Sequence, residues 1–134
     1  MGPFGDGWTS DDVDKVLVKG DPLEVLYVPI IVGMNAPDCG IEWAQSICQR
    51  LTLHPSQQIR ANAVLGLAHI ARTTRQLNLD LALPAIQRAL TDREFPVRQT
   101  AAEVVADIKV FMKSQFANHP LASSLSVTGD EGDA

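Results

Sequence analysis

The feature that most constrains the fold of this chain is a repeat within its own sequence. The stretch CQRLTLHPSQQIRANA (48–63) aligns without a gap with IQRALTDREFPVRQTA (86–101), 38 residues later. Arg60 of the first copy falls on Arg98 of the second, and the apolar positions that follow also coincide. Self-similarity at about 40 residues, with two helices in each period, is typical of stacked helical hairpins. We therefore predict an all-α fold.

The second copy, LPAIQRALTDREFPVRQTAAEVVADI (83–108), resembles a HEAT repeat. It has an amphipathic first helix ending near Asp92, a short turn, and Val-Arg98 opening a second, Ala-rich helix. The resemblance implies a right-handed α-solenoid. It also implies a structural ladder in which Asp92, Arg60 and Arg98 join neighbouring repeats beneath the turns. In the earlier copy His54 stands at the position of Asp92, so the resemblance does not predict a ladder contact from this position.

A third, degenerate copy precedes the other two. The segment DPLEVLYVPIIVG (21–33) lies under the second helix of the next copy, and SDDVDKVLV (10–18) is its partner helix. The prediction is a single domain of about three hairpins and about six helices. The first hairpin is expected to serve as an N-terminal cap, because a terminal repeat must differ from the others to close the core. The parts of the domain are a capping hairpin at 1–38, a repeat at 39–78 and a repeat at 79–117, followed by a flexible acidic tail at 118–134.

The remaining boundaries follow from proline, glycine and polar residues. We expect a turn at 35–40, a helix at 41–53, a linker at 73–79, a helix at about 80–91 and a last helix at 95–116. Gly66 lies inside a helix on its core side, and we expect a neighbouring helix to approach closely there.

Charge and apolar patterning narrow the class of partner. The net charge is −5, and phosphate contacts need a concentrated basic face, so a nucleic-acid partner is not favoured. The longest apolar run, VLYVPIIVGM, is about half the length that spans a bilayer and contains Pro29, so no membrane partner is predicted. No signal peptide is visible, and the two cysteines form no disulfide or metal pattern, which favours a cytoplasmic protein.

The sequence offers little catalytic chemistry. The three histidines have no partner at metal-ligand spacing, and Cys48 stands at a core position of the repeat. Glu103 and Asp107 share a helix face, as an acid/base pair would, but a solvated face explains them equally well. We predict a non-enzymatic protein without catalytic residues, metal or cofactor.

The second helices of the three hairpins are expected to line a concave face. On a helical wheel Ile59, Ala63 and Ile70 point to the core, whereas Ala68 is among the residues that point away. The face is predicted to be apolar at its first end and acidic at its last. Covering of the first end by the N-terminal segment is the alternative. The predicted partner-binding residues are Tyr27, Ile31, Asn62, Leu65, His69, Arg72, Gln99, Glu103 and Asp107.

Such an architecture favours a protein-protein interaction module. The chain also resembles short, stand-alone bacterial HEAT-like proteins, some of which are immunity proteins. That resemblance implies an inhibitor that neutralises a cognate toxin through its concave face, and acidity suits a basic toxin domain. The alternative is an adaptor or regulatory subunit of a larger assembly, and a nucleic-acid-directed helical-repeat protein is a further one. The pattern makes no prediction of oligomeric state.

Overall fold

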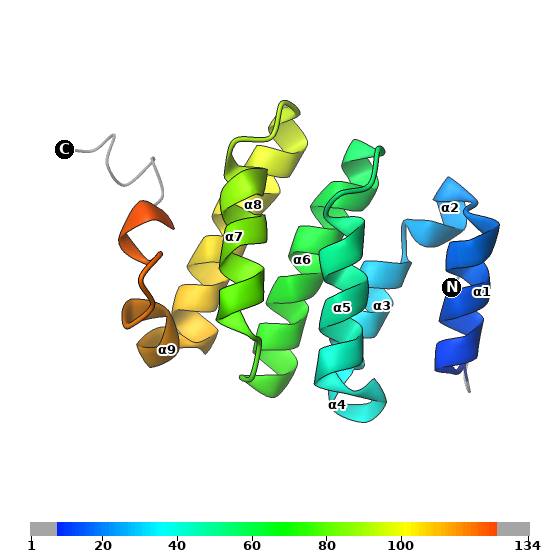
Figure 1. Cartoon of the computed structure of the whole chain (residues 1–134), viewed down its shortest axis with the longest axis horizontal. Helices are drawn as coiled ribbons and strands as arrows, with labels where there is room; N and C mark the ends of the chain where they lie inside the picture. Colours follow the sequence, from blue (N-terminus) through cyan, green and yellow to red (C-terminus); the bar gives the residue numbers. More distant parts are fainter. Residues whose placement is uncertain (1–7, 126–134) are drawn as a thin grey trace.

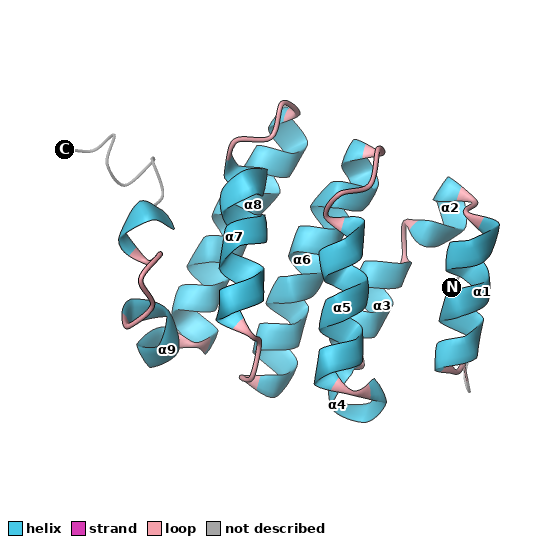
Figure 2. Cartoon of the chain, viewed as in Figure 1, coloured by secondary structure: helices cyan, strands magenta, loops and turns pink. Residues whose placement is uncertain are grey.

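The computed structural model of the chain describes residues 8–125, and every regular element in that range is helical (Figures 1 and 2). This confirms the all-α prediction. The elements are α1 (Ser10–Lys19), α2 (Pro22–Val25), α3 (Val28–Met34), α4 (Ala36–Cys39), α5 (Ile41–Leu51), α6 (Gln57–Thr74), α7 (Leu79–Leu90), α8 (Phe95–Phe111), α9 (Lys113–Ala117) and the 3-10 turn η1 (Ser123–Leu125). None of these helices is long and apolar enough to cross a membrane.

The long helices form two layers. Helices α3, α6 and α8 lie side by side in one layer, and α5 and α7 cover them from the same side (Figure 1). The apolar core lies between the layers, because α6 buries Ile59, Leu67 and Ile70 while α7 buries Leu83 and Ile86. The opposite side of the α3, α6 and α8 layer therefore has no helix of the second layer over it.

Helix α1 begins at a capping box, in which Thr9 and Asp12 pair through their side chains and backbone. The backbone N–H of Thr9 donates to the carboxylate of Asp12 at 2.7 Å. This pairing satisfies a backbone donor that has no intrahelical partner. The buried side chains of Val13 and Val16 then face the rest of the fold.

The single helix expected over 21–33 is wrong. The segment forms α2 and α3, which are separated at Leu26 and Tyr27. Pro29 has no N–H and its ring would clash with the carbonyl of Val25, so one helix cannot run through this point without a break. Pro29 instead occupies the first turn of α3, where a proline is tolerated.

The last helix also differs from the prediction of 95–116. It ends at Phe111, and α9 follows after Met112, which has a non-helical backbone. The bend lets Met112 and Phe116 bury their side chains against the end of the core. The Arg75 guanidinium carbon lies over the Phe111 ring, 4.9 Å from its centroid, next to the same bend.

The segment 118–125, expected to be part of a flexible tail, is folded back onto the domain. Leu125 is fully buried, and His119 contacts the Asp80 carboxylate of α7 at 2.8 Å. The apolar side chains at 121 and 125 have a place to pack, which outweighs the polar composition of the segment. The rest of the predicted tail, residues 126–134, lies outside the described residues.

The other boundaries shift by a few residues. The expected turn at 35–40 contains the helical turn α4, and α5 ends at Leu51 rather than at 53. Helix α6 runs through Thr74, two residues into the expected linker, and α7 begins at Leu79. Gln45 of α5 fixes this connection, because its amide donates to the Asn78 carbonyl and accepts from the Asn78 N–H, both at 2.9 Å.

The close approach expected at Gly66 is confirmed. A Cβ at this position would lie 2.6 Å from the Pro29 carbonyl oxygen of α3 and 2.7 Å from the Cys48 sulfur of α5. Gly33 of α3 is its counterpart, since a Cβ there would lie 2.6 Å from the Gly66 carbonyl oxygen. The missing side chains let the two backbones touch, which sets the spacing of α3 and α6.

Candidate functional site

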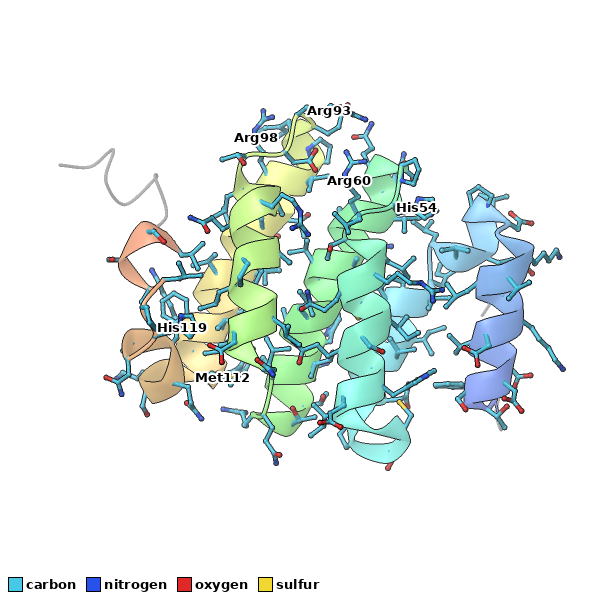
Figure 3. All side chains as sticks on the ribbon, viewed as in Figure 1. His54, Arg60, Arg93, Arg98, Met112 and His119 are labelled. Atoms are coloured by element: carbon cyan, nitrogen blue, oxygen red, sulfur yellow. The ribbon has the colours of Figure 1, made fainter. Side chains whose placement is uncertain are left out.

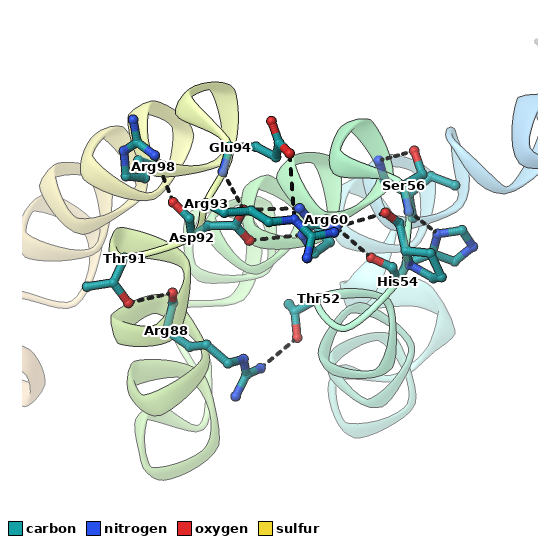
Figure 4. A network of polar contacts seen from close by, with 12 residues as sticks. Thr52, His54, Ser56, Arg60, Arg88, Thr91, Asp92, Arg93, Glu94 and Arg98 are labelled. Carbon is teal, nitrogen blue, oxygen red and sulfur yellow. Dashed lines mark hydrogen bonds and ion pairs between the residues drawn. The ribbon is translucent and has the colours of Figure 1, made fainter.

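The three predicted ladder residues meet at the turns, along one edge of the molecule (Figures 3 and 4). Arg60, at the start of α6, donates from Nε and Nη2 to the two carboxylate oxygens of Asp92 at 2.9 and 3.0 Å. The side chains are 10% and 14% exposed. Their hydrogen bonds raise the pKa of Arg60 and lower that of Asp92. The pair joins two successive hairpins.

Both arginines also make the same local contact within their own repeat. Arg60 Nη1 donates to the His54 carbonyl at 3.0 Å, and Arg98 Nη1 donates to the Asp92 carbonyl at 2.8 Å. Each carbonyl lies six residues before its arginine. Because a backbone carbonyl is available whatever the side chain, His54 can replace an acid without loss of this bond. Only the contact to the next repeat needs the carboxylate.

The side of α3, α6 and α8 that carries no second-layer helix presents all the predicted partner-binding residues except Ile31. Tyr27 is 43% exposed, Arg72, Gln99 and Glu103 are exposed, and Asn62, Leu65, His69 and Asp107 are half-buried. Their spacing of three and four residues within each helix places them on one face. We call these residues, with Met34 and Val110 added below, the open face.

Two residues expected to point away from the core are buried. Ile31 is 5% exposed and Ala68 is 4% exposed. Ile31 was placed in one row with His69 and Asp107, and both of these are only half-buried, so the row lies closer to the core than the repeat predicted. The outward positions are instead Tyr27, just before α3, and Met34 at its end, which is 51% exposed. Within residues 8–125 Tyr27 keeps 43% of its surface exposed, whereas Ile31 belongs to the core.

Two apolar residues of the open face were missed by the sequence reasoning. Met34 and Val110 occupy the positions equivalent to Arg72 in the neighbouring copies, and Val110 is 70% exposed. The 38-residue shift could have identified this third row, which runs across α3, α6 and α8. The open face is therefore apolar at Tyr27 and Met34, and apolar as well as acidic on α8.

One predicted binding residue has a structural use. The Asn62 amide donates to the Leu26 carbonyl at 2.9 Å, across 36 residues of sequence. Leu26 is the point where α2 and α3 separate, so its carbonyl has lost a helical partner. Asn62 thus secures the first hairpin to α6.

The middle of the open face combines three ionisable side chains. Arg72 Nη2 lies 3.2 Å from His69 Nδ1. Burial lowers the pKa of His69, the Arg72 charge lowers it further, and the Asp107 carboxylate opposes both. His69 therefore stays neutral to a lower pH than an ordinary histidine does.

We expect acid to destabilise the fold through its histidines before it protonates the carboxylates. Burial, with a smaller effect from Arg60, also lowers the pKa of His54 below its ordinary value of 6.5. A lowered folded-state pKa means that the unfolded chain binds the proton more tightly, so stability falls as the pH drops below about 6.5. The urea midpoint should be lower at pH 5.5 than at pH 7.5. In His54→Gln/His69→Gln the difference should shrink, and an unchanged difference would contradict the assignment.

The cysteines show no sign of activation. Cys48 is fully buried against α3, and burial raises its pKa far above the ordinary value. Burial also raises the pKa of the half-buried Cys39. Across residues 8–125 no group of three or more His, Cys, Asp or Glu side chains could hold a metal ion.

Comparisons with known proteins add no relative: no family model, no curated protein and no solved structure matches this chain.

Proposed function

We propose that this protein is a protein-binding module, an α-solenoid of HEAT-like hairpins that grips its partner on the open face. The observation that carries the proposal is the row of Tyr27, Leu65 and Glu103 at equivalent repeat positions. Tyr27, just before α3, and Glu103 of α8 are exposed, and Leu65 of α6 between them is half-buried. Stacked hairpins build extended surfaces of this kind from one side chain per repeat. An exposed tyrosine is also a common centre of binding energy.

In its more specific form the proposal is an immunity protein, a cytoplasmic inhibitor that neutralises a basic toxin domain. Two charge features support a basic partner. Glu103 is exposed at the last end of the open face, and the whole chain carries a net charge of −5. Opposite charge would steer the two proteins together and raise the rate of association. The specific form also depends on the resemblance to small bacterial HEAT-like proteins, which is an analogy of fold.

The experiment uses the full chain as bait and, separately, co-expression with the product of the neighbouring reading frame. An immunity protein recovers that product alone and restores growth of cells that express it. An adaptor recovers several proteins and does not restore growth of those cells. Recovery of no protein from the native host by the bait would contradict a binding function of either kind.

We expect Glu103→Lys/Asp107→Lys to weaken binding of the recovered partner by about 30-fold or more, because rim and core charges of an interface together contribute about 2 kcal/mol or more. The salt dependence of the affinity should become flatter at the same time. Isothermal titration at two salt concentrations measures both effects.

The matched control is Asp11→Lys/Asp14→Lys, which makes the same change of charge at two exposed positions of α1. It should alter binding much less than the variant on α8. Equal losses in the two double variants would show that net charge, and not the open face, determines the affinity.

A further inference from the structure

The turns of two neighbouring hairpins enclose a cleft of about 340 Å³ on the edge of the molecule. The α5–α6 turn, with Thr52 and Leu53, forms one wall, and Arg88 and Arg93 at the end of α7 and just beyond it form the other. The cleft lies along the edge where Figure 3 labels Arg60 and Arg93, and Figure 4 shows Arg88 reaching across it. This edge is separate from the open face.

The cleft is basic in a chain that is acidic overall. Its lining includes three arginines, at 60, 88 and 93, and a single carboxylate, that of Asp92. The net charge of the whole chain is −5. Arg60 and Asp92 neutralise each other through two hydrogen bonds, and the Glu94 carboxylate lies 3.6 Å from Arg93 and balances part of its charge. The excess positive charge of the cleft therefore belongs mainly to Arg88, with a smaller share from Arg93.

Both of these guanidinium groups retain free donors. Arg88 donates from Nη2 to the Thr52 hydroxyl oxygen at 3.2 Å, its one side-chain hydrogen bond within residues 8–125. Arg93 lies 3.6 Å from the Glu94 carboxylate, and its side chain is 78% exposed. A guanidinium group has five N–H donors in a planar fork, so each arginine can still bind an oxyanion in bidentate fashion.

The floor between the arginines is apolar. Ala85 and Ala89 are buried on α7, and their small side chains leave the hollow that Pro55 and Leu53 border from the other hairpin. Leu53 is two-thirds exposed at the rim. A ligand with an acidic head and a short apolar body matches this combination of charge and surface.

We propose that this cleft binds the oxyanion of a small ligand, a carboxylate or phosphate group, between Arg88 and Arg93. The apolar part of the ligand lies on Ala85 and Ala89. The proposal is independent of the function proposed for the open face, since the two sites use different surfaces.

The test is a titration of the ¹⁵N-labelled full chain with inorganic phosphate, acetate and butyrate at constant ionic strength. The Nε–Hε resonances of Arg88 and Arg93 should shift in a saturable way. Because the apolar part of the ligand lies on Ala85 and Ala89, butyrate should bind about threefold or more tightly than acetate, and equal affinities would contradict the role of this floor. Comparison of acetate with phosphate identifies which oxyanion the site prefers.

Three variants make the test specific. Arg88→Gln/Arg93→Gln should weaken binding by about tenfold or more, because two charged donors are lost. Arg88→Lys/Arg93→Lys keeps the positive charges but loses the planar donor groups of arginine. Its affinity should therefore fall between that of the unmodified chain and that of Arg88→Gln/Arg93→Gln. Lys15→Gln/Lys113→Gln removes the same charge from exposed positions of α1 and α9 and should bind like the unmodified chain.

Two results would overturn the proposal. One is the absence of saturation up to about 50 mM ligand, a concentration that corresponds to negligible affinity. The other is an equal loss of binding in Arg88→Gln/Arg93→Gln and in Lys15→Gln/Lys113→Gln, which would mean that the anion responds to surface charge alone. Melting curves show whether each variant is folded, and they keep loss of binding distinct from loss of structure.

Discussion

Replacing Asp92 with alanine is expected to lower the free energy of unfolding by about 3 kcal/mol, because removing one partner leaves a buried charge uncompensated. Arg60 would keep its bonds to the carbonyls of His54 and Pro55 but would lose both bonds to the carboxylate. Asp92 also accepts from the Glu94 N–H at 2.9 Å, which orders the turn before α8. Urea denaturation monitored by circular dichroism measures the loss.

A double-mutant cycle separates the ion pair from the turn. Asp92→Asn keeps an oxygen for the Glu94 N–H and removes the charge, and Arg60→Met removes the guanidinium group. The double variant should be more stable than the sum of the single changes predicts, by about 1 to 3 kcal/mol, the range of coupling for residues in direct contact. Asp14→Ala, an exposed aspartate of α1, should change the free energy by less than about 0.5 kcal/mol. Additive single changes would show that the pair does not join the hairpins.

Gly66→Ala is expected to destabilise the protein by about 2 kcal/mol or more, although the same change in an open helix stabilises it by about 0.5 to 1 kcal/mol. The added methyl group would lie 2.6 Å from the Pro29 carbonyl oxygen and 2.7 Å from the Cys48 sulfur. The nearest atom is backbone, so α3 must move away from α6. The thermal midpoint and the urea midpoint of the variant both report the loss.

Ala106→Gly is the matched control, because it exchanges the same two residues at an exposed position of α8. It should cost about 1 kcal/mol, the intrinsic preference for alanine in a helix. Gly33→Ala should behave like Gly66→Ala, since its methyl group would meet the Gly66 carbonyl oxygen at 2.6 Å. A Gly66→Ala variant as stable as the unmodified chain would mean that the two helices are not in contact there.

The repeat within the sequence predicted the features that depend on register. It placed Arg60 and Arg98 at equivalent positions, and the structure shows both donating to the carbonyl six residues before. This prediction depends only on which residues occupy the same position of each hairpin, and a shift of 38 residues reveals that directly.

The errors have local causes. Ile31 was assigned to the outward face together with His69 and Asp107, but this row lies close to the core, since His69 and Asp107 are half-buried and Ile31 is buried. The segment 118–125 was judged by its polar composition, although Leu125 finds a buried place on the domain. The cleft between Arg88 and Arg93 was not anticipated, because it depends on how two turns are spaced and not on any motif.

Site-specific photo-crosslinking tests the open face most directly. Gln99 of α8 and Gln87 of α7 are both exposed glutamines, and only Gln99 lies on the open face. A photoreactive residue at each position, in separate full-length variants, is irradiated in a lysate of the native host. Our account predicts a crosslinked protein from position 99 and none from position 87. A protein captured from position 87 alone would contradict it.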